Sequence, residues 1–135
     1  MDKTEIRRAS CGVLVRAGRI LLGLPGPGAR SHNGQWDVIG GHRESGETDE
    51  QTMLRELHEE LGIVPTKYKN AGVLTEEFAD AQYQLRFFSV QEWDGTPTNC
   101  SNEHVEIAWF FPSEISKLDL TSLSMAPILS KIASG

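Results

Sequence analysis

The stretch GHRESGETDEQTMLRELHEELGI, residues 41–63, carries the strongest folding signals in the chain. Thr48 and the glutamine three positions later form a capping box, and two acids follow Thr48 directly, where the positive end of a helix dipole stabilises negative charge. Gly62 supplies a stop signal at the other end. These features predict a helix over residues 49–61.

The predicted helix carries more acid than its stability requires. On a helical wheel its three leucines share one side, which we expect to face the core, and Glu56, Glu59 and Glu60 share the other. Like charges one turn apart cost about 0.2–0.5 kcal/mol, and anions in the last turn cost about 0.3–1 kcal/mol each. Such unfavourable placements are typical of functional sites. Taken alone, such a face is more often a solvated acidic surface, and a binding site for a hard divalent cation is the alternative.

The spacing of these residues matches a family signature. Five residues separate Gly41 from Glu47, seven more separate Glu47 from Arg55, and the segment ends in glycine and isoleucine. The segment resembles the complete Nudix box, G-x5-E-x7-R-E-U-x-E-E-x-G-U, where U is a bulky aliphatic residue. Upstream, Ile39 stands where many members carry proline. The resemblance implies an α/β (α+β) fold, a Nudix-like α/β/α sandwich with a mixed β-sheet flanked by helices.

The resemblance also implies a chemistry. Similar proteins use Mg²⁺ or Mn²⁺ and water to cleave a phosphoanhydride bond in a nucleoside diphosphate derivative. Glu56, Glu59 and Glu60 would supply the metal-binding and base carboxylates, with Glu59 favoured as the base and Glu56 as the alternative. The carbonyl of Gly40 would be a further metal ligand, because two adjacent glycines let the backbone turn sharply and approach the ion.

Other residues take supporting roles under the same resemblance. Glu47 would hold the loop that starts at Gly41 against the helix, and Arg55 would orient the glutamate one turn on. Many relatives add one more metal-binding acid from a loop before a late strand. Glu103 is favoured for that role over Glu106, because Glu106 falls within an expected strand.

Several cationic and aromatic side chains are candidates for contacting the substrate. They are Arg43, which follows the glycine pair most closely, Arg30, Arg7, Arg8 and Trp36. Each has a plainer alternative, since most arginines lie on the surface and most strand aromatics pack in the core. His42 and His104 flank the expected site but lack the paired spacing of a zinc motif, so we interpret them as bystanders.

The region about fifteen residues beyond the box bears on the substrate. Relatives that hydrolyse ADP-ribose tend to carry proline there, and those that hydrolyse dinucleoside polyphosphates carry tyrosine, whereas residues 77–81 contain neither. The predicted substrate is therefore a nucleoside triphosphate, including oxidised forms, cleaved to the monophosphate and pyrophosphate. ADP-sugars and dinucleoside polyphosphates are the alternatives within the class. A non-catalytic nucleotide-sensing module is the alternative outside it, although such modules usually lose an acid of the box.

The rest of the chain predicts strands and short helices around the acidic helix. No linker or repeat divides residues 1–135, so we expect one domain. The expected strands are 10–16 and 19–24, joined as a hairpin, then 36–39, 72–78, 83–93 and 105–111, and the expected further helices are 112–117 and 126–133. This intermixing favours a mixed sheet sandwiched by helices.

Composition and net charge limit the kinds of partner that this protein is expected to bind. Lys and Arg number 13 against 19 Asp and Glu, a net charge of −6, which argues against binding to nucleic acid polymers or anionic membranes. The longest apolar stretch, 20–24, is far shorter than the ~20 residues that span a bilayer. Cys11 and Cys100 form no CxxC motif, which favours free thiols in a reducing cytoplasm. We expect a cytoplasmic enzyme with a small nucleotide-type substrate, and family habit leaves a homodimer open.

Overall fold

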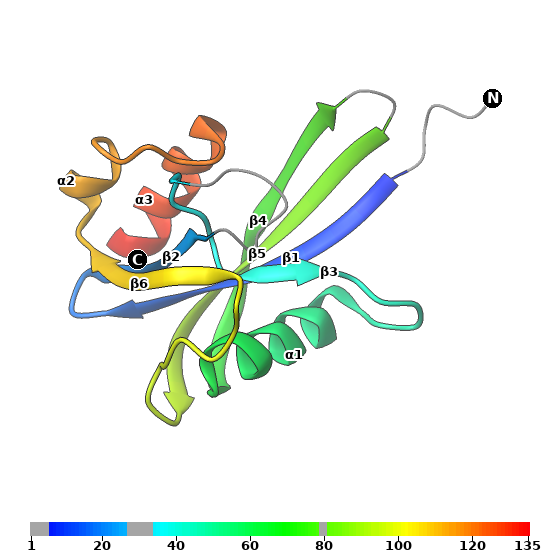
Figure 1. The fold of residues 1–135 in the computed structure, drawn as a ribbon, viewed down its shortest axis with the longest axis horizontal. Helices are drawn as coiled ribbons and strands as arrows, with labels where there is room; N and C mark the ends of the chain where they lie inside the picture. Colours follow the sequence, from blue (N-terminus) through cyan, green and yellow to red (C-terminus); the bar gives the residue numbers. More distant parts are fainter. Residues whose placement is uncertain (1–5, 27–33, 79–80) are drawn as a thin grey trace.

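The computed structural model describes residues 6–26, 34–78 and 81–135, which form a mixed sheet between helices (Figure 1). The strands are β1 (Ile6–Arg16), β2 (Arg19–Pro25), β3 (Gly40–His42), β4 (Val64–Phe78), β5 (Ala81–Asp94) and β6 (His104–Phe110). The helices are α1 (Asp49–Leu61), α2 (Pro112–Ile115) and α3 (Ala126–Ser134), with a 3₁₀ turn, η1 (Leu123–Met125), before α3. The predicted fold class is confirmed.

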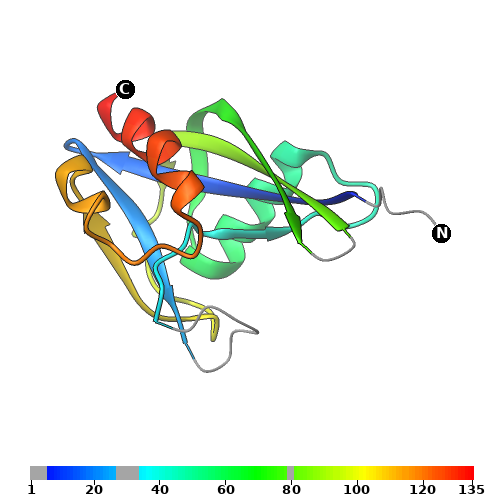
Figure 2. The same cartoon turned by 90° about the horizontal axis from the view of Figure 1, so that it is seen from above.

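The sheet has the order β4-β5-β1-β2-β6, and β3 pairs separately with β1. β1 runs parallel to β5, whereas the other pairs are antiparallel. Residues 6–14 of β1 pair with β5, and only its last two residues pair with β2. The ribbon of β2 and β6 therefore splays away from β4 and β5, as the view from above shows (Figure 2).

Helices cover both faces of this sheet. α1 packs one side through Met53, Leu57 and Leu61, which are fully buried with residues of β1 and β5. Gly12 of β1 makes this close contact feasible, because a Cβ there would lie 2.4 Å from Leu57 Cδ1. α3 buries Leu129 and its neighbours in a second core cluster on the other side. The two clusters fill the spaces between the sheet and the helices on either side, as the expected sandwich requires.

The central helix begins and ends where the sequence predicts. Thr48 and Gln51 form both bonds of the capping box, and Gly62 adopts the left-handed conformation with φ of 70°. The hairpin between β1 and β2 is also confirmed, with positive φ at both Ala17 and Gly18, as a tight hairpin turn requires. β4 begins eight residues earlier than predicted, since it continues through three register shifts as an edge strand that tolerates Pro65.

The predicted strand over 36–39 is wrong. Trp36 and Asp37 make only isolated bridges, to Leu120 and Gly23, and the strand β3 starts at Gly40 instead. The segment crosses between neighbours that are remote in sequence, which a local pattern does not reveal.

Two further expectations concern the cysteines and the membrane. Cys11 is buried in β1, Cys100 is exposed, and both are free thiols, as expected. Within residues 6–26, 34–78 and 81–135, none of the helices has the length and apolar character needed to cross a membrane.

Candidate functional site

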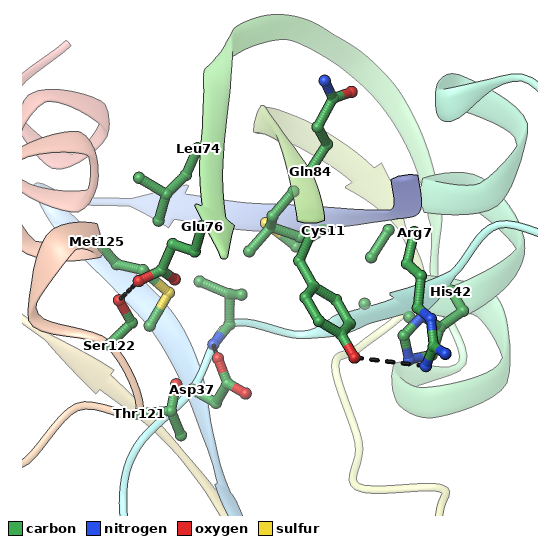
Figure 3. A pocket seen from close by; sticks show the side chains of 16 residues that line it. Arg7, Cys11, Asp37, His42, Leu74, Glu76, Gln84, Thr121, Ser122 and Met125 are labelled. Atoms are coloured by element: carbon green, nitrogen blue, oxygen red, sulfur yellow. Dashed lines mark hydrogen bonds between the residues drawn. The ribbon is translucent and has the colours of Figure 1, made fainter. Parts of the chain in front are cut away.

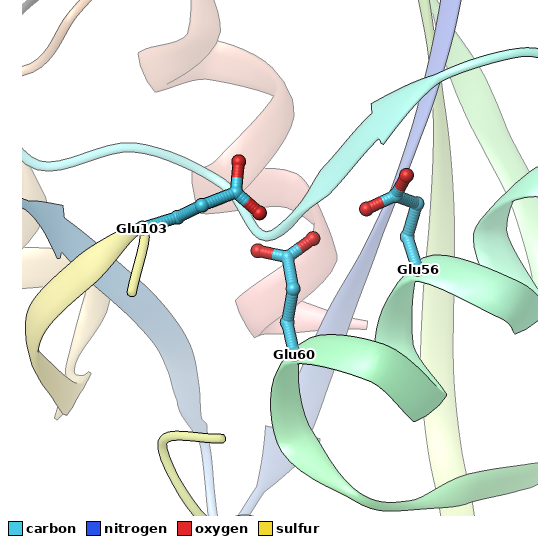
Figure 4. Close-up of side chains that lie close together, drawn as sticks. All are labelled: Glu56, Glu60 and Glu103. Atoms are coloured by element: carbon cyan, nitrogen blue, oxygen red, sulfur yellow. The ribbon is translucent and has the colours of Figure 1, made fainter. Parts of the chain in front are cut away.

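Three carboxylates from two separate segments point toward one another (Figure 4). Glu56 and Glu60 lie one turn apart on α1, and Glu103 lies just before β6. One oxygen from each falls within 4.8 Å of the others. We call these residues the carboxylate cluster. Its members include Glu103 and not Glu106, in agreement with the preference drawn from the sequence.

The loop before β6 is fixed to the end of α1, and this places Glu103. The amides of Thr98 and Cys100 donate to the carbonyls of Leu61 and Glu60 at 3.0 and 2.9 Å. Carbonyls in the last turn of a helix have no partner within the helix, so a loop that donates to them is held firmly. Glu103 is thereby carried over the helix face that bears the two glutamates.

Glu60 is the buried member of the cluster, with 2% of its surface exposed. Burial raises the pKa of Glu60 well above its usual range, and the nearby carboxylates, Glu56 foremost, add to the shift. Its Oε1 lies 2.7 Å from Nε2 of His104, whereas its Oε2 is buried with no hydrogen-bond partner among the described residues. A buried, unpartnered carboxylate oxygen next to two further acids fits a divalent cation, which would supply the missing partner.

Glu103 and His104 respond to the same environment. Burial, followed by the charges of Glu56 and Glu59, raises the pKa of Glu103. Burial lowers the pKa of His104, which disfavours the charged imidazolium beside Glu60.

Two adjacent glycines bring the backbone of β3 against this cluster. A Cβ on Gly41 would lie 2.4 Å from the carboxyl carbon of Glu56, so only glycine leaves room for that side chain. A Cβ on Gly40 would lie 2.0 Å from the carbonyl oxygen of Ser10, because β3 is pressed onto β1. Each glycine is required for a different close approach.

Arg55 links the glycine loop to the helix. Its Nε donates to Oε2 of Glu47 at 2.7 Å, and its Nη2 donates to the carbonyl of His42 at 3.1 Å. Its Nη1 donates to Glu56 at 2.8 Å and, more weakly, to Glu59 at 3.4 Å. These bonds from Arg55 hold the pKa of Glu47 at about 2. Arg55 therefore touches the carboxylate cluster through Glu56 more closely than it touches Glu59.

Glu59 lies outside the carboxylate cluster. Its side chain is 56% exposed, on the solvent side of Arg55. The expectation that three glutamates share one helix face therefore needs correction in one respect, because Glu60 turns into the protein while Glu59 turns to solvent.

A cavity of about 590 Å³ adjoins the glycine pair (Figure 3). It is lined by residues of β1, β3, β4, β5 and the segments around 37 and 122, including Arg7, Cys11, Asp37, Gly40, Gly41, Leu74, Glu76, Tyr83, Ser122 and Met125. Two carboxylates face it, and one of them, Glu76, accepts a hydrogen bond from Ser122 at 3.1 Å. The rest of the lining mixes apolar side chains, such as Leu74 and Met125, with polar ones, such as Gln84 and Thr121, and the size suits a small organic ligand.

The candidate substrate contacts have separate positions. Arg7 lines this cavity, and Arg7, Arg8 and Arg43 line a second hollow beside the glycine loop. Arg43 also lies 3.5 Å from Asp49. Trp36 packs edge-to-face on Phe110, with ring centroids 4.8 Å apart, and does not line the cavity.

One candidate lies outside the description, and several residues were not foreseen. Arg30 falls outside the described residues. Sequence reasoning missed Asp37 and Glu76 because both lie in expected strands, although Asp37, a lone acid in an apolar run, was a usable signal. His104 is not a bystander, since it contacts Glu60, and its position directly after Glu103 was the available clue.

Comparison with known proteins gives the family. A family model described as NUDIX domain matches residues 6–132. The 8-oxo-dGTP diphosphatase of Proteus vulgaris is 43% identical over 65 residues, 47% of this chain and 58% of that protein, so the match spans little more than half of that relative. The CTP pyrophosphohydrolase of Escherichia coli K12 is 31% identical over 76% of this chain and 73% of its own.

A solved structure agrees in fold. The MutT NUDIX hydrolase from Burkholderia pseudomallei superposes with a TM-score of 0.79 over 93% of this chain and 96% of its own, at 24% identity. The family model covers nearly all of the described residues, and the box, the helix and the glycine pair lie within it. The chain therefore belongs to the NUDIX domain family.

Proposed function

We propose that this protein is a Mg²⁺- or Mn²⁺-dependent hydrolase that converts a nucleoside triphosphate, including oxidised forms, to the monophosphate and pyrophosphate. One observation carries the proposal: the carboxylate cluster and the ligand-sized cavity meet at Gly41. The names of the relatives support it, since they act on 8-oxo-dGTP and CTP.

The placement of the cavity supports a nucleoside in it. Gly40 and Gly41 line the cavity, and Gly41 also lies next to Glu56 of the carboxylate cluster. A base and sugar lodged among the apolar residues would direct the phosphates toward the glycine pair. Arg7 lines the cavity and Arg43 lines the hollow beside the glycine loop, and both would add positive charge near the phosphates.

The residues that would hold the metal are Glu56, Glu60 and Glu103, with Glu59 and the carbonyl of Gly40 as further ligands. The bound cation would polarise the phosphoryl oxygens and make the attacking water more acidic. The chain has a net charge of −6, so the protein's overall field repels a polyphosphate and the positive charge must be local.

The remaining chemistry falls to the protein's own side chains. Water attacks the α- or the β-phosphorus, and the bond from that phosphorus to the α,β-bridging oxygen breaks. The bridging oxygen leaves with pyrophosphate after attack at the α-phosphorus and with the monophosphate after attack at the β-phosphorus. Glu59 accepts the proton of the water, with Glu56 as the alternative base, because Glu59 is the exposed acid beside the cluster. Arg55 bonds to both Glu47 of the glycine loop and Glu56 of α1, and so holds the loop and the Glu56 side chain in fixed relative positions.

The carboxylates of Asp37 and Glu76 indicate which bases the cavity favours. Both face the cavity, and a carboxylate only accepts hydrogen bonds when ionised. They would pair best with a base edge rich in N–H donors, such as that of guanine or 8-oxoguanine. The net charge of −6 disfavours a nucleic acid polymer as partner. The free thiols support a reducing compartment such as the cytoplasm.

The test is a panel of nucleoside triphosphates, 8-oxo-dGTP, ADP-ribose and a dinucleoside polyphosphate, with pyrophosphate and phosphate release measured with Mg²⁺ and with EDTA. We expect pyrophosphate from a triphosphate in the presence of Mg²⁺ only, and loss of turnover in Glu56→Gln. Turnover of none of these by folded protein would overturn the proposal. Nucleotide binding without turnover would favour the sensing module instead.

A further inference from the structure

The side chain of His104 joins the two segments that form the carboxylate cluster. His104 is the first residue of β6 and follows Glu103 directly. Its side chain is 7% exposed, and its Nε2 lies 2.7 Å from Oε1 of Glu60 on α1. Its carbonyl accepts a hydrogen bond from Asn99 at 2.8 Å, which fixes the same backbone that carries Glu103.

The ring occupies a niche that only glycine provides. A Cβ on Gly23 of β2 would lie 2.6 Å from Nδ1 and 2.8 Å from Cε1 of His104. Gly23 is itself held in place, because it pairs with Ile107 of β6 and exchanges two backbone hydrogen bonds with Asp37, at 2.9 and 2.8 Å. The His104 ring therefore packs against a backbone segment that is fixed by hydrogen bonds. Its Nδ1 is buried with no hydrogen-bond partner among the described residues.

The contact divides the two oxygens of Glu60 between different tasks. His104 engages Oε1, whereas Oε2 is buried without a protein partner in the described part of the chain. A carboxylate that is free to rotate would present either oxygen to a cation. A hydrogen bond to one oxygen removes that freedom, and outer partners of this kind typically tune metal affinity by 10- to 100-fold.

We propose that His104 is a positioning residue: its Nε2–H bond to Oε1 of Glu60 fixes the rotation of that carboxylate so that Oε2 is presented beside Glu56 and Glu103. This inference rests on the proposed metal-dependent function. The ring would be in the tautomer that carries its proton on Nε2, with a bare Nδ1 against Gly23. His104 acts through Glu60 and touches neither substrate nor cation.

The test measures Mn²⁺ binding without nucleotide, by calorimetry and by the loss of the free-ion signal in electron paramagnetic resonance. His104→Leu should weaken Mn²⁺ binding by about 10- to 100-fold. His104→Gln retains an N–H donor and should recover most of that affinity. His58→Leu is the matched control, because His58 lies exposed on α1, the helix that carries Glu60. This variant should bind Mn²⁺ like the unmodified chain.

Every result of this test either supports or overturns the positioning role of His104. Unchanged Mn²⁺ binding in His104→Leu, or a Gln variant as weak as the Leu variant, would overturn the positioning role while leaving the metal site in place. An unmodified protein that binds no Mn²⁺ would overturn both this inference and the proposed function. Should His104→Leu fail to fold, Gly23→Ala displaces the ring instead, and about tenfold weaker Mn²⁺ binding is then expected, whereas unchanged binding would overturn the inference.

Discussion

Adding one methyl group at Gly41 should damage the metal site while sparing the fold. A Cβ at this position would lie 2.4 Å from the carboxyl carbon and Oε2 of Glu56, whereas ordinary contacts begin at 3.4 Å, so the carboxylate must retreat by about 1 Å (3.4 − 2.4). The far end of a glutamate side chain can move that distance at little cost. The backbone of Gly41 also lacks the positive φ that would exclude alanine.

The expected effect on stability is therefore small and the effect on function large. In Gly41→Ala the free energy of unfolding without metal should change by less than about 1 kcal/mol, since alanine also restricts the unfolded chain. A displacement of 1 Å at a reacting centre costs as much as ~10²-fold in rate. We expect turnover to fall by about that factor, with Mn²⁺ binding weakened about tenfold.

Gly40→Ala is the matched control, one residue away. Its Cβ would lie 2.0 Å from the carbonyl oxygen of Ser10 and 2.6 Å from Cα of Cys11, which are backbone atoms that cannot rotate aside. Overpacking of this kind costs about 1–3 kcal/mol or more, so the melting temperature should drop by several degrees. Thermal melts with EDTA, Mn²⁺ calorimetry and steady-state kinetics separate the two variants. Wild-type Mn²⁺ affinity and turnover in Gly41→Ala would refute the assigned contact.

Three further predictions follow from the same geometry. Glu59→Gln should cut turnover by ~10² or more with an unchanged or slightly raised melting temperature in EDTA, and retained activity would remove Glu59 as the base. Burial raises the pKa of Glu60 from its ordinary 4.5 to about 10, so the metal-free protein should lose stability as pH rises from the first value toward the second. Thermal melts across pH should give a flatter profile for Glu60→Gln, and parallel profiles would contradict this. Saturating Mg²⁺ should raise the melting temperature of the unmodified chain but not of Glu56→Gln, and equal shifts would contradict the site.

Local chemistry predicted the helix that bears the site. The capping box at Thr48 and the glycine at 62 act within a few residues of the helix ends, so the sequence alone specifies where α1 begins and ends. The acids of the box followed from their spacing. Glu103 was suggested by the family resemblance, because many relatives add an acid from a loop before a late strand, and the structure brings it to Glu56 and Glu60.

Features that depend on contacts between segments remote in sequence could not be predicted from the sequence. β3 pairs with β1, about thirty residues earlier, and starts at Gly40, where a Cβ would lie 2.0 Å from the carbonyl oxygen of Ser10. The burial of Glu60 and the exposure of Glu59 depend on the loop over residues 95–103, which periodicity does not describe. The cavity and the niche for His104 arise where segments remote in sequence meet, so neither has a local signature.

The most direct measurement is a crystal structure with Mn²⁺, in which anomalous scattering locates the ion independently of the protein. A strong anomalous peak is expected within about 2.0–2.6 Å of carboxylate oxygens from Glu56, Glu60 and Glu103. Saturating Mn²⁺ with no peak among these three residues, or a peak elsewhere while Oε2 of Glu60 keeps no partner, would contradict the assignment of this cluster as the metal centre.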